Sequence, residues 1–305
     1  MLHFIKLTRP VNLLVIVLTM YILHGHYLTM TPHGLKKELF FEFHFALLVI
    51  STVFIAAAGN IINDYFDVKI DRINKPDKLI VDKYIKKRVV ILFHSVLNVT
   101  AVLIALLMFF AHGFYWAILF HLFTTFHLYL YSMMLKRKFL SGNIVISVLA
   151  AMVPILVYLY DMDVYSFAGN SEHEQAFHLM AYFALFAFCT TLIREIQKDF
   201  ADMKGDAFYG CKTVPILLGL RKGRMILFSI FSFTILTFIV LFVLKARINP
   251  VNISFFVAII LLMSFSLFLS FKAIKRKQWN SASFIMKLVM IVALIFFGYK
   301  LFYAG

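Results

Sequence analysis

Two eight-residue segments of the chain carry aspartates at the same spacing. DYFDVKID at residues 64–71 and DFADMKGD at residues 199–206 each have aspartates at the first, fourth and eighth positions, with an aromatic residue second. On an α-helix these aspartates fall within an arc of about 60° and extend over about 10 Å, so each segment presents three carboxylates along one edge. Carboxylates this close repel one another unless a cation lies between them, and oxygen ligands without His or Cys favour a hard ion such as Mg²⁺. Because Mg²⁺ is commonly held by carboxylates together with substrate phosphates, two such edges that face each other could hold Mg²⁺ around a diphosphate.

Basic residues next to these two acidic segments fit a phosphate ligand. Arg72 and Lys75 follow the first segment, Lys198 directly precedes the second, and Lys136 and Arg137 end an apolar run between them. Guanidinium and ammonium groups bind phosphate oxygens and stabilise a departing diphosphate. Each basic residue also has a competing explanation, because the cytoplasmic loops of membrane proteins are enriched in Lys and Arg. Their convergence with the aspartates is what favours a site.

The composition indicates that these segments belong to a membrane protein. Hydrophobic residues make up 62% of the 305 residues, charged residues only 15%, and the mean hydropathy is +0.89. These values lie outside the range of soluble globular domains. The apolar runs recur without a polar or Pro/Gly-rich linker, so we expect one domain over residues 1–305. In such a protein the net charge of +15 marks cytoplasmic loops, and no nucleic-acid partner is expected.

The elements that must position the acidic segments are transmembrane helices. Nine apolar runs are long enough to cross about 30 Å of hydrocarbon at about 1.5 Å per residue. They cover residues 11–28, 43–62, 88–111, 114–134, 143–161, 177–196, 223–244, 252–271 and 281–302. The linker at residues 112–113 predicts a tight helical hairpin. We therefore expect an all-α integral membrane fold with nine transmembrane helices.

The distribution of Lys and Arg predicts the orientation of these helices. Most of the 30 basic residues fall before the first run and in alternate loops after it, which predicts a cytoplasmic N-terminus. Both acidic segments then lie on the cytoplasmic side of a multi-pass protein of the cell membrane. The carboxylates of the opposite loops are expected to be solvated loop charges, and the histidines at the end of the first run to have packing or interfacial roles. These residues are Asp161, Asp163, Glu172 and Glu174, and His24 and His26.

Longer stretches around both segments resemble a known family. GNIINDYFDVKIDRINKPDK at residues 59–78 is similar to the first aspartate-rich motif of the UbiA superfamily of intramembrane prenyltransferases. REIQKDFADMKGD at residues 194–206 resembles the second motif of that family, whose DxxxD falls on Asp202 and Asp206. RPVN at residues 9–12 and YSMMLKR at residues 131–137 extend the likeness over nearly the whole chain. The pattern departs from many members after the first motif, where KLIVDKYIKK replaces a basic turn rich in Pro, Ser and Gly.

The resemblance implies a fold, a reaction and a set of site residues. It implies helices around a central cavity, Mg²⁺-dependent binding and ionisation of a polyprenyl diphosphate such as geranylgeranyl diphosphate, and transfer of the prenyl group to an acceptor. The implied metal ligands are Asn63, Asp64, Asp67, Asp71, Asp199, Asp202 and Asp206, of which Asp67, Asp71, Asp202 and Asp206 are also the expected catalytic residues. The expected substrate-binding residues are Arg72, Lys75, Lys136, Arg137 and Lys198 on the diphosphate, with Arg9 and Asn12 near the acceptor.

The acceptor is the least determined part of this interpretation. The lead-in REIQKD resembles that of digeranylgeranylglyceryl phosphate synthases, which use an isoprenoid glycerol phosphate, and we slightly favour such a membrane lipid. An aromatic acceptor of quinone biosynthesis, 4-hydroxybenzoate or dihydroxynaphthoate, is the alternative.

Other classes of protein fit the sequence less well. An ion-coupled transporter would carry its carboxylates near the middle of the membrane, whereas most acidic residues here lie outside the apolar runs. A CDP-alcohol phosphotransferase requires DG followed by AR, which neither segment has. A scaffold protein would lose nothing when the aspartates are removed.

Overall fold

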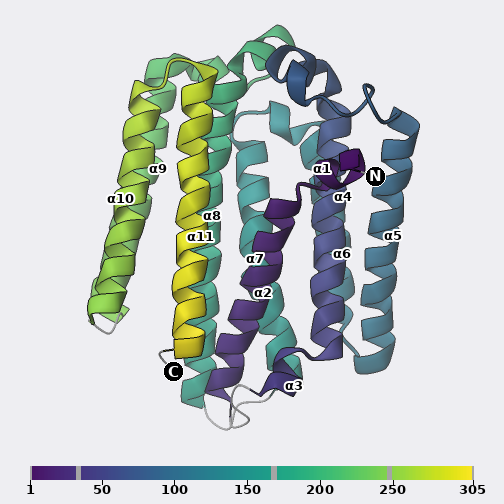
Figure 1. Ribbon diagram of the computed structural model, residues 1–305, viewed down its shortest axis with the longest axis vertical. Coiled ribbons are helices and arrows are strands. Elements are labelled where there is room, and N and C mark those ends of the chain that lie inside the picture. The colour runs from purple at the N-terminus through teal and green to yellow at the C-terminus, as the bar shows by residue number, and fades with distance from the viewer. Residues whose placement is uncertain (1, 32–35, 166–169, 246–248, 304–305) are drawn as a thin grey trace. The chain divides into compact units, whose positions relative to one another are not determined.

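The computed structural model describes residues 2–31, 36–165, 170–245 and 249–303, and over these residues the chain is almost entirely helical (Figure 1). In the first half the helices are α1 (Leu2–Thr8), α2 (Pro10–Met30), α3 (Lys37–Phe40), α4 (Phe43–Asn74), α5 (Lys87–His112) and α6 (Tyr115–Met133). In the second half they are α7 (Ser141–Val164), α8 (Asn170–Phe208), α9 (Val214–Lys245), α10 (Pro250–Lys272) and α11 (Arg276–Tyr303). An isolated bridge between Val81 and Ile85 is the single β-type pairing in this described part. The all-α prediction is confirmed.

Eight of the described helices are long and apolar enough to cross a membrane. They are α2, α4, α5, α7, α8, α9, α10 and α11. Helix α6 occupies the predicted fourth run, but its sequence YWAILFHLFTTFHLYLYSM is diluted by Tyr, His and Thr, and it is not among the eight. The protein is therefore a multi-pass membrane protein, and the count of nine spans stays a prediction.

The chain divides into two compact units. Unit 1 comprises Met1–Leu135 and Ala151–Ala184, and unit 2 comprises Lys136–Ala150 and Leu185–Gly305. Helices α7 and α8 each contribute residues to both units. The first acidic segment belongs to unit 1 and the second to unit 2.

Both acidic segments are helical, because the helices that carry them continue well past the apolar runs. Helix α4 extends to Asn74, where the sequence predicted a span ending at residue 62, and α8 extends to Phe208, where it predicted an end at residue 196. The prediction that a loop begins directly after each of these two spans is therefore wrong. The continuation of each helix places the three aspartates of each segment along one helical edge.

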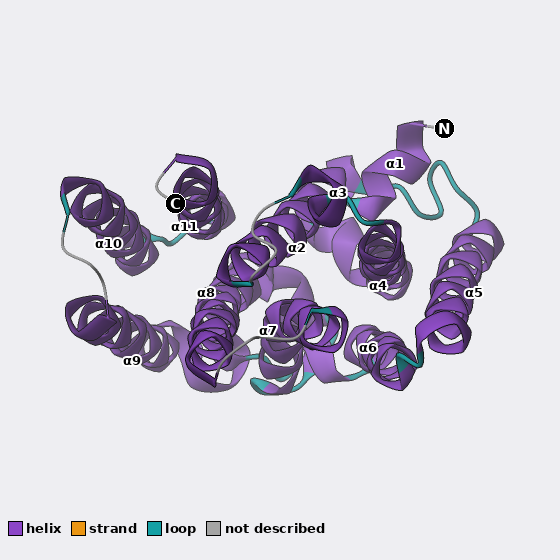
Figure 2. Ribbon diagram, turned by 90° about the horizontal axis from the view of Figure 1, so that it is seen from below, coloured by secondary structure: helices purple, strands orange, loops and turns teal. Residues whose placement is uncertain are grey.

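In unit 1, α4 packs against α5 and α6, and the view in Figure 2 shows these three helices as neighbours. The hairpin between α5 and α6 is as tight as predicted, with Gly113 at φ 75° between the two helices, a conformation that glycine adopts without steric cost. The segment KLIVDKYIKK also packs here, because Val81 and Ile85 are buried in a cluster with Ile61 and Val68 of α4. The aromatic residue of the first acidic segment, Tyr65, packs against this same cluster.

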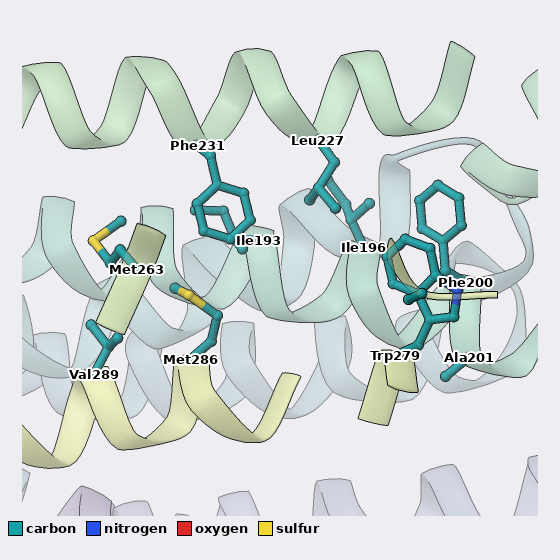
Figure 3. Close-up of a cluster of buried hydrophobic side chains, with 11 residues drawn as sticks. Ile193, Ile196, Phe200, Ala201, Leu227, Phe231, Met263, Trp279, Met286 and Val289 are labelled. Carbon is teal, nitrogen blue, oxygen red and sulfur yellow. The ribbon is translucent and has the colours of Figure 1, made fainter. Parts of the chain in front are cut away.

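In unit 2, α8, α9, α10 and α11 share a second hydrophobic cluster (Figure 3). Phe200, the aromatic residue of the second acidic segment, stacks on Trp279 of α11 with the ring centroids 4.2 Å apart. Gln197, one turn earlier on α8, donates hydrogen bonds to Ser266 and Ser270 of α10, both at 2.9 Å. The repeated aromatic position thus anchors each acidic segment to the hydrophobic cluster of its own unit.

One carboxylate predicted to be a solvated loop charge, Asp161, is buried instead, and it is buried against His24, for which the sequence predicted a packing or interfacial role. The Asp161 side chain has no exposed surface, because α7 continues to Val164, and its Oδ1 lies 2.6 Å from Nδ1 of His24. Asp163 accepts a hydrogen bond from Nε1 of Trp116. The prediction of solvated loop charge holds for Asp163 and Glu174, which are exposed, while the side chain of Glu172 lies outside the described residues.

Candidate active site

The first acidic segment begins at an ion pair with Arg9. Nη2 of Arg9 lies 2.5 Å from Oδ1 of Asp64. Arg9 stands between α1 and α2 in the left-handed conformation, with φ 56° and ψ 64°, and Pro10 begins α2 directly after it. Proline is favoured at this first helical position because it needs no backbone donor there. The break between the two helices thus sets the backbone position from which Arg9 reaches α4.

The other aspartates of the first segment have partners from α4 and the residue that follows it. Asp67 is buried and accepts a hydrogen bond at 3.0 Å from the side-chain amide of Asn63, one turn earlier. Asp71 lies 3.5 Å from Nζ of Lys75. Each of these two carboxylates thus has an amide or ammonium partner one turn away along the chain.

Two residues predicted to bind substrate, Arg72 and Asn12, are seen here in contacts with Asp82 and with the backbone of Arg9. Arg72 pairs with Asp82 at 2.9 Å, and its side chain is 59% exposed, so in this structure it lies at the surface of the unit. Asn12 stands in the first turn of α2, where its backbone N–H donates to the carbonyl of Arg9. Their roles toward diphosphate and acceptor stay predictions.

Residues from two other helices of unit 2 contact the second acidic segment. Oδ2 of Asp199 accepts a hydrogen bond at 2.9 Å from the amide of Asn143, which is buried in the first turn of α7. Oδ1 of Asp202 lies 3.3 Å from Nη2 of Arg276 at the start of α11. Asp206 is buried and close enough for its charge to act on Asp199. Like-charged carboxylates gathered in a buried setting favour a bound cation.

A carboxylate not predicted as a site residue organises the basic side chains of unit 2. Oε1 of the buried Glu195 lies 2.5 Å from Nζ of Lys198 and 3.1 Å from Nη1 of Arg194. The positive charge of Lys136 acts on both Glu195 and Asp199. The predicted residues Lys136 and Lys198 are therefore brought together with the second segment.

Arg137 differs from Lys136 and Lys198, the other basic residues predicted near the second segment. Its side chain is exposed, while its backbone carbonyl accepts a hydrogen bond at 2.7 Å from the N–H of Lys212. This bond joins the chain before α7 to the chain before α9. A contact between the Arg137 side chain and diphosphate stays a prediction.

Sequence reasoning missed three residues of this site: Asn143, Glu195 and Arg276. A carboxylate at the end of an apolar span is a signal for Glu195, because such groups are costly in a membrane unless they have a function or a partner. Asn143 and Arg276 meet the second segment only through tertiary packing, and an isolated Asn or a basic residue at a helix start carries no specific pattern.

The donor set fits Mg²⁺ in its chemistry. The side chains along each edge offer carboxylate and amide oxygens and no sulfur or imidazole, which is the choice of a hard ion. Among the described residues, no group of three or more His, Cys, Asp and Glu forms a metal site by itself. Mg²⁺ sites in proteins commonly use one or two carboxylates together with water and substrate phosphates.

Comparisons with known proteins find similar chains along most of this sequence. The chain matches the family described as "UbiA prenyltransferase family" over residues 13–299. It is 35% identical over 182 residues to the digeranylgeranylglyceryl phosphate synthase of Thermococcus sibiricus, covering 59% of each chain. It is 30% identical over 265 residues to the synthase of the same name from Thermococcus kodakarensis, covering 84% of this chain and 85% of that protein. The match spans about three fifths of the length of the first relatives, 59% and 61%.

Solved structures show the same fold. A structure reported for digeranylgeranylglyceryl phosphate synthase in membranes superposes with a TM-score of 0.64 at 22% identity, covering 97% of this chain and 96% of that one. A UbiA homologue from Archaeoglobus fulgidus bound to DMAPP and Mg²⁺ superposes with a TM-score of 0.59 at 16% identity, covering 97% and 99%.

Proposed function

The chain belongs to the UbiA prenyltransferase family, and we propose from that membership that it transfers a polyprenyl group from a polyprenyl diphosphate to a membrane-associated acceptor. We propose geranylgeranyl diphosphate as donor, an isoprenoid glycerol phosphate as acceptor and Mg²⁺ as cofactor. The names of the synthases from two Thermococcus species support this acceptor class. Residues 1–305 act in this proposal as one domain, in keeping with the family match over residues 13–299.

The observation that carries the proposal is the placement of three carboxylates along one edge of α4 and three along one edge of α8, each set beside basic or amide partners. The metal ligands in this proposal are Asn63, Asp64, Asp67, Asp71, Asp199, Asp202 and Asp206. Bound Mg²⁺ would neutralise diphosphate charge and so make diphosphate a better leaving group. If both segments take part in the reaction, a variant of either one should lose transfer, which the single variants below test.

Several residues of the chain would have specific roles in the proposed reaction. Lys136 and Lys198, held near Glu195, would bind diphosphate oxygens and stabilise their charge as the bond between C1 of the prenyl group and the diphosphate oxygen breaks. The electron pair of that bond remains on the diphosphate. The acceptor hydroxyl oxygen then forms a bond to C1, and its proton passes to the released diphosphate. Apolar helices around the site would keep water from capturing the allylic cation.

We place the diphosphate-binding side of the protein in the cytoplasm. The basis is the gathering of Lys and Arg in the loops that adjoin both acidic segments. Accessibility labelling of a cysteine introduced at the exposed Lys83, compared with one introduced at the exposed Tyr115, would test this orientation in intact cells.

The proposal is tested by transfer of radiolabelled geranylgeranyl and farnesyl groups from their diphosphates by purified protein with Mg²⁺. The acceptors are geranylgeranylglyceryl phosphate, 4-hydroxybenzoate and dihydroxynaphthoate. We expect product with the glycerol phosphate, loss of product on chelation with EDTA, and loss in Asp67→Asn and in Asp202→Asn. The matched control is Asp77→Asn, since Asp77 is exposed just after the first segment. Undiminished transfer in both site variants would refute the proposed site, and ion flux without prenyl transfer would favour a transporter.

A further inference from the structure

Arg276 begins α11 and is not among the donor-binding residues named so far, yet the turn in front of it has a defined structure. The side chain of Gln278 caps the start of the helix, where its Oε1 accepts from the backbone N–H groups of Ile274 and Lys275 at 2.7 and 2.9 Å. A glutamine that reaches back in this way satisfies backbone donors that have no helical partner. The cap thereby fixes the direction in which the chain enters α11.

Two contacts attach this turn to α8 and α9. Nη2 of Arg224 on α9 donates a hydrogen bond to the backbone carbonyl of Ala273, which follows α10. Trp279 of α11 is buried and stacks on Phe200 of the second acidic segment (Figure 3), and the guanidinium of Arg224 lies 5.7 Å from the centre of a Trp279 ring. Arg276 precedes Trp279 by three residues and shares its side of α11. The side of α11 that meets the second acidic segment therefore carries Arg276 as well.

The guanidinium of Arg276 is held beside a proposed metal ligand by one contact. Its Nη2 lies 3.3 Å from Oδ1 of Asp202, and the two side chains are 32% and 17% exposed. This is the single hydrogen bond of the Arg276 side chain within the described residues, and its Nε is buried without a partner. A guanidinium has five N–H donors, and a pair of them can bind one oxyanion. The contact with Asp202 thus leaves most of the donors of Arg276 unused.

A diphosphate that shares a metal ion with Asp202 would lie within reach of this guanidinium. Mg²⁺ holds its oxygen ligands at about 2 Å, so two ligands of one ion lie within about 4 Å of each other. A carboxylate that binds Mg²⁺ also balances the charge of a nearby guanidinium less well, and the guanidinium then favours another anion close by. Rotation of the Arg276 side chain, which is partly exposed, would be sufficient for this exchange.

From these contacts we infer that Arg276 is a further residue that binds the diphosphate of the donor. Without donor its guanidinium pairs with Asp202, and with donor and Mg²⁺ it donates to diphosphate oxygens. This inference rests on the proposed function and deepens it, because it adds a residue of α11 to Lys136 and Lys198 as binding groups of the leaving diphosphate. Arginine suits this role better than lysine, since its planar group can donate two parallel hydrogen bonds to one phosphate.

The experiment measures the binding of geranylgeranyl diphosphate to Arg276→Met by calorimetry, with Mg²⁺ and without acceptor. We expect the Kd for this donor to rise about 10- to 100-fold, the effect of losing hydrogen bonds between charged groups. Arg276→Lys keeps the charge and loses the planar group, and it should show a smaller rise. Binding of Mg²⁺ alone should be unchanged or tighter in Arg276→Met, because the variant removes a cation that pairs with a ligand of the metal.

The matched control is Lys277→Met, which removes an exposed cation from the adjacent position of α11 and should leave the Kd for the donor unchanged. The thermal unfolding midpoint of each variant is recorded alongside. If Arg276→Met lowers this midpoint, the comparison of Arg276→Lys with wild type carries the test, because that variant retains the ion pair with Asp202.

An unchanged Kd for the donor in Arg276→Met would overturn the inference. Equal weakening of donor binding and of Mg²⁺ binding alone would also overturn it, because Arg276 would then serve only to hold Asp202 in place. Donor binding that depends on Arg276, without prenyl transfer to any acceptor, would contradict the proposed function alone. Prenyl transfer by wild type and Arg276→Met with the same KM for the donor would contradict the inference alone.

Discussion

The two ends of unit 1 both hold charged side chains among apolar helices, but they hold them differently. At one end, Asp64 and Asp71 pair with Arg9 and Lys75, and all four side chains retain between 20% and 37% of their exposure. At the other end, His24 and Asp161 pair at 2.6 Å with no exposure at all. Residue 42 precedes residue 64 by about 33 Å along α4, close to the thickness of a hydrocarbon core of about 30 Å.

The fully enclosed end is closed by contacts within the protein. His24 stacks on Phe45 with ring centroids 3.9 Å apart, and its Nε2 lies 3.1 Å from the carbonyl oxygen of Leu39. Glu42 caps α4 by accepting from the backbone N–H groups of His44 and Phe45, and it also accepts the hydroxyl of Tyr160. We call His24, Glu42, Tyr160 and Asp161 the buried polar cluster.

The difference shows how to distinguish a structural charge from a functional one in this protein. In the buried polar cluster the partners are enclosed and fixed, so breaking one contact should affect folding. Along the acidic segment the pairs of Asp64 with Arg9 and of Asp71 with Lys75 are partly exposed, so breaking one contact should affect ligand binding. The variants of Asp67, His24 and Asp161 described below test this contrast.

The largest expected effect is on activity at the acidic segment. Asp67→Asn keeps the shape of the side chain and removes the charge of a proposed Mg²⁺ ligand, so we expect kcat/KM to fall by about 10³-fold. The thermal unfolding midpoint should change little, because the amide can still bond with Asn63. A loss of stability parallel to the loss of activity would show that Asp67 belongs with the structural charges.

The buried polar cluster should respond in the opposite way. His24→Ala leaves the Asp161 carboxylate buried without its partner, and we expect the free energy of unfolding to fall by about 3 kcal/mol. Prenyl transfer at permissive temperature should be retained. His26→Ala, a half-buried neighbour on α2, is the control.

A double variant sharpens this comparison. His24→Phe with Asp161→Leu removes both charges and fills similar volume, and it should recover most of the stability lost in His24→Ala, since well-packed apolar residues often replace a buried ion pair without loss. The free energy of unfolding is measured by chemical unfolding in detergent. If the double variant does not recover it, the cluster contributes more than the pairing of these two side chains.

A smaller effect is expected where a neutral group supports the second acidic segment. Asn143→Ala removes the amide that donates to Asp199, and we expect about a tenfold weaker apparent affinity for Mg²⁺. The Mg²⁺ dependence of transfer at saturating donor measures this, and Asn143→Asp serves as the contrast because it adds a further carboxylate. An unchanged Mg²⁺ dependence in Asn143→Ala would indicate that Asp199 does not bind the metal.

The smallest effect is expected at Arg72. Its side chain is 59% exposed and pairs with Asp82, so its charge is screened by solvent. Arg72→Ala should raise the KM for the diphosphate only about two- to threefold, and less at high salt. An effect as large as that of Lys198→Ala would show that Arg72 turns toward the diphosphate when substrate binds.

Much of the fold was predictable from the sequence because long apolar runs and the requirement for internal backbone hydrogen bonds leave few choices in a membrane. The acidic segments were found because their spacing repeats. The helix ends were not predictable in this way. The polar sequence after residue 62 is typical of a loop, yet Tyr65 and Val68 pack in a cluster that includes Val81 and Ile85. This tertiary burial extends α4 beyond the apolar run. Asp161 was misjudged for the same reason, because its partner His24 lies 137 positions away in the chain.

The backbone at Arg9 has a consequence for protein engineering. A left-handed conformation costs an arginine roughly 1–2 kcal/mol that a glycine would not lose. A stability-guided redesign would therefore replace Arg9 with glycine and obtain a more robust backbone, but it would also delete the guanidinium that meets Asp64. Thermostable designs of this chain should hold Arg9 fixed, and a screen that scores only heat resistance would select against this contact.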